Sequence, residues 1–208
     1  MRTDRVILRS ILTTLLSIIV MFGIMLGALC WLFPSAMTKI THDLGMDKAS
    51  LRYATRTYKR TGDVTYAAFA FDSAISLKEL VEIEENGLLF IADDEFLSYC
   101  KLLDKEIATN SETVKENQRI TMPYEQYVYG QVTMAQYLQG KKADAIATAL
   151  ASIQNRFPRN NAAALLYITA SKGGDTEIAV TLKTKMQELR VSELTEEDRA
   201  YLEDILSA

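Results

Sequence analysis

Histidine and cysteine are scarce in this chain, and their scarcity limits the chemistry that the protein can perform. The 208 residues include one histidine, His42, and two cysteines, Cys30 and Cys100. A histidine-based metal site, a Ser-His pair or a Cys-His pair cannot be assembled from one histidine close to an apolar segment. The sequence also contains no glycine-rich phosphate loop and no nucleophile elbow. It therefore predicts a protein that is not an enzyme, with no catalytic residue, no cofactor and no metal.

The remaining candidates for chemistry are a single thiol and two acidic clusters. Only Cys100 follows residue 34, so this part of the chain cannot close an internal disulfide. Cys100 falls on an apolar helical stripe, which predicts a buried thiol. The acidic clusters at residues 82–85 and 93–95 have neither EF-hand spacing nor the separation of a glycosidase pair. We expect them to be solvated surface.

Proline is rare, and alternating β patterns are almost absent, so the chain is predicted to be all-α. Its three prolines and most of its nine glycines fall between apolar stripes of helical period. The pattern predicts helices at about residues 46–60, 64–85 and 94–108 and another that opens at Pro123, with Asp47, Asp63 and Thr195 as helix caps. Residues 109–121 are polar and predict a long loop.

Charge is absent from residues 11–33, and this run predicts a transmembrane helix. A cleaved signal peptide is the alternative, but its apolar core is usually about 7 to 15 residues long. Arg2, Arg5 and Arg9 precede the run, which favours an N-terminus inside the cell. The resulting expectation is a single-pass protein of the cell membrane, which contacts the lipid bilayer through residues 11–33 and has an extracytoplasmic C-terminal domain. Gly23 and Gly27 form a small-xxx-small pair that could let two such helices pack closely.

An excess of basic residues is also absent from the part that follows the predicted membrane helix. Residues 34–208 hold 20 basic and 26 acidic residues, a net charge of −6. Nucleic acid and anionic lipid headgroups both need a basic footprint, so we expect no nucleic-acid partner. The predicted organisation is a basic flank at residues 1–10, the membrane helix, a juxtamembrane segment at 34–45 and one helical domain at 46–208.

A period of 34 residues is present in the C-terminal half. Gly140 recurs as Gly174 and Ala145 as Ala179, each displaced by 34 positions. A glycine lets the chain reverse between two antiparallel helices, and a small residue five positions later lets those helices approach closely. The sequence resembles the tetratricopeptide repeat (TPR) family at these positions and at others around them. The TPR-like units are about 47–76, 124–158 and 159–190, with an irregular insert at 80–122 and a capping helix at 196–206.

The resemblance implies an α-solenoid that binds other proteins or peptides in a groove. Tyr124, Tyr127 and Tyr129 are the candidates for partner binding, because an aromatic ring with a polar tip is a common anchor. They could equally be packing residues of the repeat. The predicted function is a membrane-anchored, non-catalytic scaffold or adaptor at the bacterial cell envelope. The alternative is a structural subunit that forms homo-oligomers through its transmembrane helix, with Gly23 and Gly27 at the contact.

Overall fold

The computed structural model describes residues 2–110, 122–154, 157–188 and 194–207, and within them the regular structure is α-helical throughout. The predicted all-α class is therefore correct for this part of the chain. The described helices are α1 (Arg2–Leu32), α2 (Pro34–Asp43), α3 (Asp47–Thr61), α4 (Val64–Leu77), α5 (Leu80–Ile91), α6 (Phe96–Asn110), α7 (Tyr124–Leu138), α8 (Lys142–Ala151), α9 (Ala162–Gly173), α10 (Thr176–Gln187) and α11 (Glu196–Ser207).

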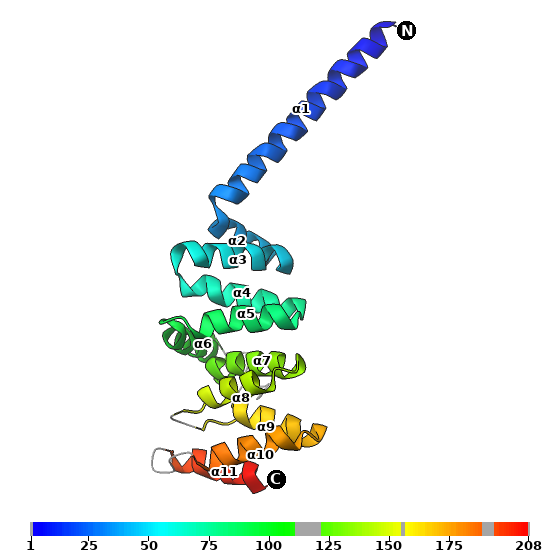
Figure 1. Cartoon of the computed structure of the whole chain (residues 1–208). Helices are drawn as coiled ribbons and strands as arrows, with labels where there is room; N and C mark the ends of the chain where they lie inside the picture. Colours follow the sequence, from blue (N-terminus) through cyan, green and yellow to red (C-terminus); the bar gives the residue numbers. More distant parts are fainter. Residues whose placement is uncertain (1, 111–121, 155–156, 189–193, 208) are drawn as a thin grey trace.

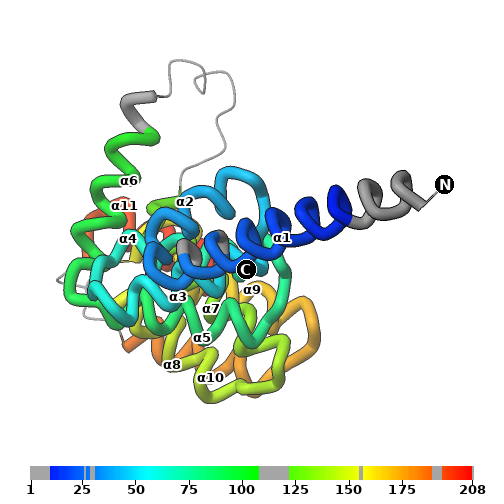
Figure 2. The backbone as a smooth tube through the Cα atoms, turned by 90° about the horizontal axis from the view of Figure 1, so that it is seen from above, coloured from blue at the N-terminus to red at the C-terminus, as the bar shows by residue number. Residues whose placement is uncertain are grey.

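The helices after α1 form an elongated stack, and α1 extends away from one end of it (Figure 1). α2 and α3 lie at the end next to α1, and α11 lies at the opposite end. Successive helices pack on one another from α2 to α5, α5 packs on α7, and α7 packs on both α8 and α9. α6 lies beside the stack, in contact with α4 and α7 (Figure 2). This arrangement fits the predicted α-solenoid.

The predicted transmembrane helix at residues 11–33 is contradicted, because no helix in the described residues is long and apolar enough to span a bilayer. The single-pass topology, the location in the cell membrane and the extracytoplasmic placement were inferred from that helix and are corrected with it.

In the described part of the chain, four connections between helices contain a glycine with a left-handed backbone: Gly45 (φ 65°), between α2 and α3, and three others in the segments predicted as repeat units. Gly62, Gly140 and Gly174 have φ of 68°, 77° and 73°, and they separate α3 from α4, α7 from α8 and α9 from α10. An L-residue with a side chain rarely adopts this conformation, so glycine is the residue that permits the reversal. These pairs fall in the segments predicted as repeat units. The tetratricopeptide family assignment itself stays a prediction.

The predicted helix at residues 64–85 is wrong in its extent, because the structure has two helices there in place of one. α4 ends at Leu77, and Lys78 adopts φ 58°, with its N–H donating to the Ile75 carbonyl. α5 then begins at Leu80. The end of α4 was not predicted from the sequence, because the left-handed position that is usually a glycine is occupied here by a lysine. α6 extends to Asn110, two residues into the predicted loop, and residues 111–121 of that loop lie outside the described residues.

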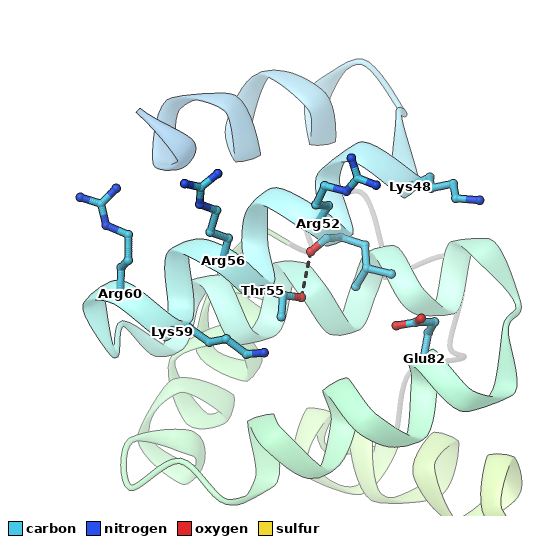
Figure 3. Close-up of a pocket in the computed structure, with 8 residues that line it drawn as sticks. Lys48, Arg52, Thr55, Arg56, Lys59, Arg60 and Glu82 are labelled. Atoms are coloured by element: carbon cyan, nitrogen blue, oxygen red, sulfur yellow. Dashed lines mark hydrogen bonds between the residues drawn. The ribbon is translucent and has the colours of Figure 1, made fainter. Parts of the chain in front are cut away.

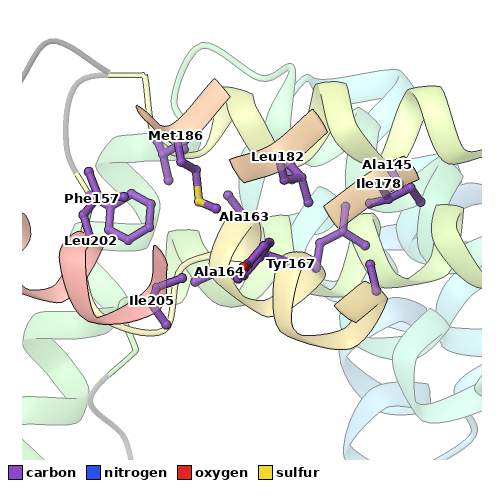
Figure 4. Packing of buried hydrophobic residues seen from close by; sticks show 14 of the residues in the cluster. Ala145, Phe157, Ala163, Ala164, Tyr167, Ile178, Leu182, Met186, Leu202 and Ile205 are labelled. Carbon is purple, nitrogen blue, oxygen red and sulfur yellow. The ribbon is translucent and has the colours of Figure 1, made fainter. Parts of the chain in front are cut away.

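The stack contains two hydrophobic cores. The upper core joins α4, α5, α6 and α7, and its aromatic centre is Phe90, whose ring lies 4.9 Å from that of Phe96 and 6.2 Å from that of Phe71. The lower core joins α8, α9, α10 and α11 around Phe157, Leu182 and Met186 (Figure 4). α11 closes this second core with Leu202 and Ile205, as a terminal capping helix should.

Gly87 lies where α5 packs most closely on its neighbours. A Cβ placed on Gly87 would lie 2.2 Å from Val132 Cγ2 of α7 and 3.0 Å from Phe71 Cε2 of α4. Gly87 lies inside α5 and is buried. Its role is therefore close packing of three helices.

We expect Gly87→Ala to destabilise the protein by about 1–3 kcal/mol, because Val132 is β-branched and cannot move aside without repacking the upper core. Gly130→Ala is the matched control. Gly130 is also helical and buried, but its added Cβ would meet only Leu165 Cδ2, at 3.6 Å. Urea unfolding measures both variants. Equal stability of Gly87→Ala and Gly130→Ala would contradict the close-packing role.

Glu84 connects α5 with the end of α7 and the turn before α8. Its side chain is buried, where it pairs with Lys141 and accepts a hydrogen bond of 2.8 Å from Gln139 Nε2. Burial alone would raise the pKa of Glu84, but the hydrogen bonds from Lys141 and Gln139 outweigh it and lower the pKa below its usual value. The expectation of a solvated acidic cluster is thus wrong at this residue.

The Glu84 pKa predicts an acid-dependent loss of stability. A carboxylate whose folded pKa is lowered contributes stability above its unfolded pKa, near 4.5, and loses that contribution as the pH falls through the folded value. We expect Glu84→Gln to lower the free energy of unfolding by about 1–2 kcal/mol at pH 7, with the difference shrinking below about pH 4.5. Glu85→Gln, an exposed change one position along α5, is the control. A pH-independent difference would contradict this account.

Candidate binding site: a basic groove between α3 and α5

The three tyrosines predicted to bind a partner lie in the first two turns of α7. Tyr124, Tyr127 and Tyr129 are all half-buried and pack against the upper core. The Tyr124 hydroxyl donates a 3.1 Å hydrogen bond to Asp72, and the Tyr129 ring lies 6.0 Å from that of Phe96 in an edge contact. Burial and the charge of Asp72 raise the pKa of Tyr124, so its hydroxyl is a neutral donor. The structure brings these tyrosines together but places them beside α4 and α6, and their role in partner binding stays a prediction.

The two glycines predicted to pack membrane helices, Gly23 and Gly27, lie in the exposed part of α1. A Cβ on either residue would meet nothing within 4 Å. The helix packing proposed for them depended on the membrane-spanning helix, which the structure contradicts. They therefore contribute to no site that the described residues form.

The residues with catalytic potential occupy structural positions. The His42 ring packs 4.7 Å from that of Phe69. Burial raises the pKa of Cys100 to about 12, so the thiol stays protonated near neutral pH, as expected for a packed residue. Asp93 accepts a 2.7 Å hydrogen bond from the Tyr58 hydroxyl. In the described part of the chain, no three histidine, cysteine or acidic side chains gather to hold a metal ion.

The most distinctive polar surface is a row of cations along α3. Lys48, Arg52, Arg56 and Arg60 recur every four residues, Lys59 lies beside the last of them, and all five side chains are exposed. At about 100° per residue, Lys48, Arg52 and Lys59 point within about 40° of one another. Arg56 and Arg60 point progressively further round the helix. The row is about 18 Å long at 1.5 Å per residue.

This row borders a groove between α3 and α5, which we call the basic groove. The groove has a volume of about 540 Å³ (Figure 3). Thr55 contacts Asn86 of α5, and Glu82 of α5 borders the other side of the groove. Its lining residues are Lys48, Leu51, Arg52, Thr55, Arg56, Lys59, Arg60 and Glu82.

One hydrogen-bond contact on the α5 side, between Thr55 and Asn86, joins the two walls of the groove. The Thr55 hydroxyl lies 2.9 Å from the Leu51 carbonyl and 3.2 Å from Asn86 Oδ1. Asn86 Nδ2 donates to the Glu82 carbonyl at 2.9 Å and lies 3.3 Å from Glu82 Oε2. The one carboxylate that borders the groove is thus engaged by an amide of its own helix.

A smaller pocket adjoins the basic groove where α1 ends. This Trp31 pocket has a volume of about 290 Å³ and is lined by Trp31, Leu32, Arg56 and Arg60. The Arg56 guanidinium lies 5.9 Å from the centre of the Trp31 ring, which is cation–π distance. Trp31 is still 63% exposed, and Leu32 is 53% exposed. Arg56 and Arg60 therefore border both the groove and an accessible apolar surface.

The five cations of the basic groove are not neutralised within the described residues, where none of them forms an ion pair with a carboxylate. α3 carries these five basic residues and a single acidic one, Asp47. The rest of the domain is acidic, so positive charge is concentrated on one helix. A row of uncompensated cations creates a positive local potential that attracts anionic groups.

The basic groove was not predicted from the sequence, because only the net charge of the whole domain was considered. The net charge of residues 34–208 is negative, and that average hid a local row of the opposite sign. The signal that could have found it is the four-residue spacing of Lys48, Arg52, Arg56 and Arg60, which places like charges on neighbouring turns of one helix.

Comparison of the chain with protein-family models, with curated proteins and with solved structures gives no match. The site is therefore interpreted from its geometry and charge.

The positive potential can be measured at Trp31, the only tryptophan in the chain. Removing one cation about 6–8 Å from the ring changes the energy of an approaching anion by about 0.5 kcal/mol in water. We expect Arg56→Gln to lower the iodide quenching constant of Trp31 fluorescence about twofold at low salt, and to raise caesium quenching. Lys101→Gln, which removes an exposed cation on α6, should change neither constant. Unchanged iodide quenching in Arg56→Gln would refute a focused potential.

Proposed function

We propose that this protein is a non-catalytic scaffold that binds another protein through the basic groove. The observation that carries the proposal is the row of five exposed, uncompensated cations that borders a 540 Å³ groove between α3 and α5. Holding like charges on adjacent turns of one helix destabilises that helix by a few tenths of a kcal/mol per pair. Binding of a partner with complementary charge would offset this repulsion in the complex.

The architecture supports the same function. Stacked antiparallel helix pairs present an extended surface on which several helices contribute side chains to one partner. α3 and α5 contribute to the groove, and buried contacts of α5 with α4 and α7 hold it in position. The resemblance to tetratricopeptide repeats, with Gly62, Gly140 and Gly174 at the turns, belongs to this proposal and implies the same class of function.

The alternative function, a subunit that oligomerises through a transmembrane helix at residues 11–33, loses its basis with that helix. Gly23 and Gly27 lie in the exposed part of α1 and have open space around them. Binding of a partner in the basic groove is therefore the function that the geometry favours.

Photo-crosslinking tests this proposal. A benzophenone side chain in place of Lys48, which lines the groove at the end of the cation row, should give a discrete adduct with a partner protein in cells that express the chain. The same side chain at position 180 of α10 is the control, because Val180 is equally exposed but far from the groove. Addition of Arg52→Gln should reduce the adduct at position 48. Adducts of equal yield at positions 48 and 180, or none at position 48, would contradict the proposal.

A further inference from the structure

We infer that the partner presents an acidic segment of six or seven residues that lies along α3, with an aromatic or large aliphatic residue at the end that reaches the Trp31 pocket. This inference rests on the proposed function and specifies the chemistry of the bound segment. Two adjoining surfaces carry it: the cation row of the basic groove and the apolar surface of Trp31 and Leu32 between Arg56 and Arg60.

The length of the cation row sets the length of the segment. Lys48 and Arg60 are twelve residues apart on α3, which is about 18 Å along the helix axis. An extended peptide advances about 3.3 Å per residue, so the five or six steps that cover the row join six or seven residues. Successive cations four residues apart are about 6 Å apart along the axis, which matches every second side chain of an extended segment.

The apolar surface specifies the residue at one end of the segment. The Trp31 pocket, at about 290 Å³, is large enough for one aromatic or large aliphatic side chain. Such a side chain would cover Trp31 and Leu32, which are each more than half exposed. It would also exclude water from the Arg56 and Arg60 guanidinium groups, which strengthens their attraction to neighbouring carboxylates.

A protein segment fits this site better than a phosphate polymer or a flat anionic surface. Glu82 places a carboxylate on the α5 side of the groove, where it would repel a chain with a charge on every unit. Leu51 and the Trp31 pocket add apolar surface within the same site. A peptide can place carboxylates opposite Arg52 and Lys59 and uncharged residues opposite Glu82 and Leu51, because its side chains vary along its length.

The experiment is a fluorescence-anisotropy titration of labelled peptides with the full-length chain. The main probe is an eight-residue peptide with four glutamates at alternate positions and a terminal phenylalanine, made in both residue orders. One control peptide has glutamine in place of each glutamate, and another has alanine in place of phenylalanine. We expect at least a tenfold weaker affinity for the glutamine peptide, and about a fivefold weaker affinity for the alanine peptide.

Two protein variants connect binding to the site. The double variant Arg52→Gln with Lys59→Gln should bind the acidic peptide at least tenfold more weakly, and the affinity should depend less on salt concentration. Lys101→Gln with Lys172→Gln removes two exposed cations outside the groove and should leave the affinity within twofold. Circular dichroism establishes that both double variants fold. An equal loss in both would show that only net charge matters and would overturn the inference.

The remaining outcomes separate this inference from the proposed function. If the glutamine peptide binds as tightly as the acidic one, or if anionic phospholipid vesicles or a short oligonucleotide displace the acidic peptide at equal charge concentration, the acidic-segment inference fails. The apparent molecular mass from light scattering could also rise with protein concentration. If the double variant Arg52→Gln with Lys59→Gln abolishes that rise, a second copy of the chain fills the groove, and the acidic-segment inference is overturned. The proposed function fails separately, when benzophenone at position 48 gives no partner adduct.

Discussion

The close approach of three helices at Gly87 is the constraint on which the geometry of the groove depends. α5 can lie against both α4 and α7 only because position 87 has no side chain, with Val132 and Phe71 occupying the space where a Cβ would be. The position of α5 in turn determines the distance from Glu82 and Asn86 to α3. Thr55 of α3 and Asn86 of α5 lie 3.2 Å apart on this side of the groove. Packing in the upper core thus sets the geometry of a surface site.

The one ion pair of α5 among the described residues is made on the side away from α3, and the cations of α3 are left without a carboxylate partner. Glu84 pairs with Lys141 and Gln139, toward α7 and α8. Glu82 is engaged by Asn86 of its own helix. Neither carboxylate forms an ion pair with α3 among the described residues. The domain therefore carries a negative net charge and a positive groove together, and distant acidic residues weaken the groove potential little beyond a Debye length of about 8 Å at physiological salt.

Sequence patterns predicted the features that depend on local backbone chemistry. The turns at Gly62, Gly140 and Gly174 follow from the need for a left-handed residue between antiparallel helices, and Asp63 caps α4 by accepting from the Thr65 N–H at 2.9 Å. Features that depend on partners distant in sequence were not predicted. The break at Lys78 has no glycine signal, and the packing role of Gly87 requires knowledge of Val132 and Phe71. The membrane-spanning segment was predicted from composition alone, and the described part of α1 does not support it.

The same distinction explains why the sequence favoured a binding site on α7, whereas the structure favours one on α3. Tyrosines are often chosen as binding anchors because they have a large apolar ring and a polar tip, but those properties also suit a half-buried packing position. Asp72 and Phe96 supply such a position for Tyr124 and Tyr129. Cations on an exposed helix face have no equivalent use inside the fold, since a lysine or arginine is rarely buried without a partner. The five basic residues of α3 are therefore better evidence for binding than the three tyrosines of α7.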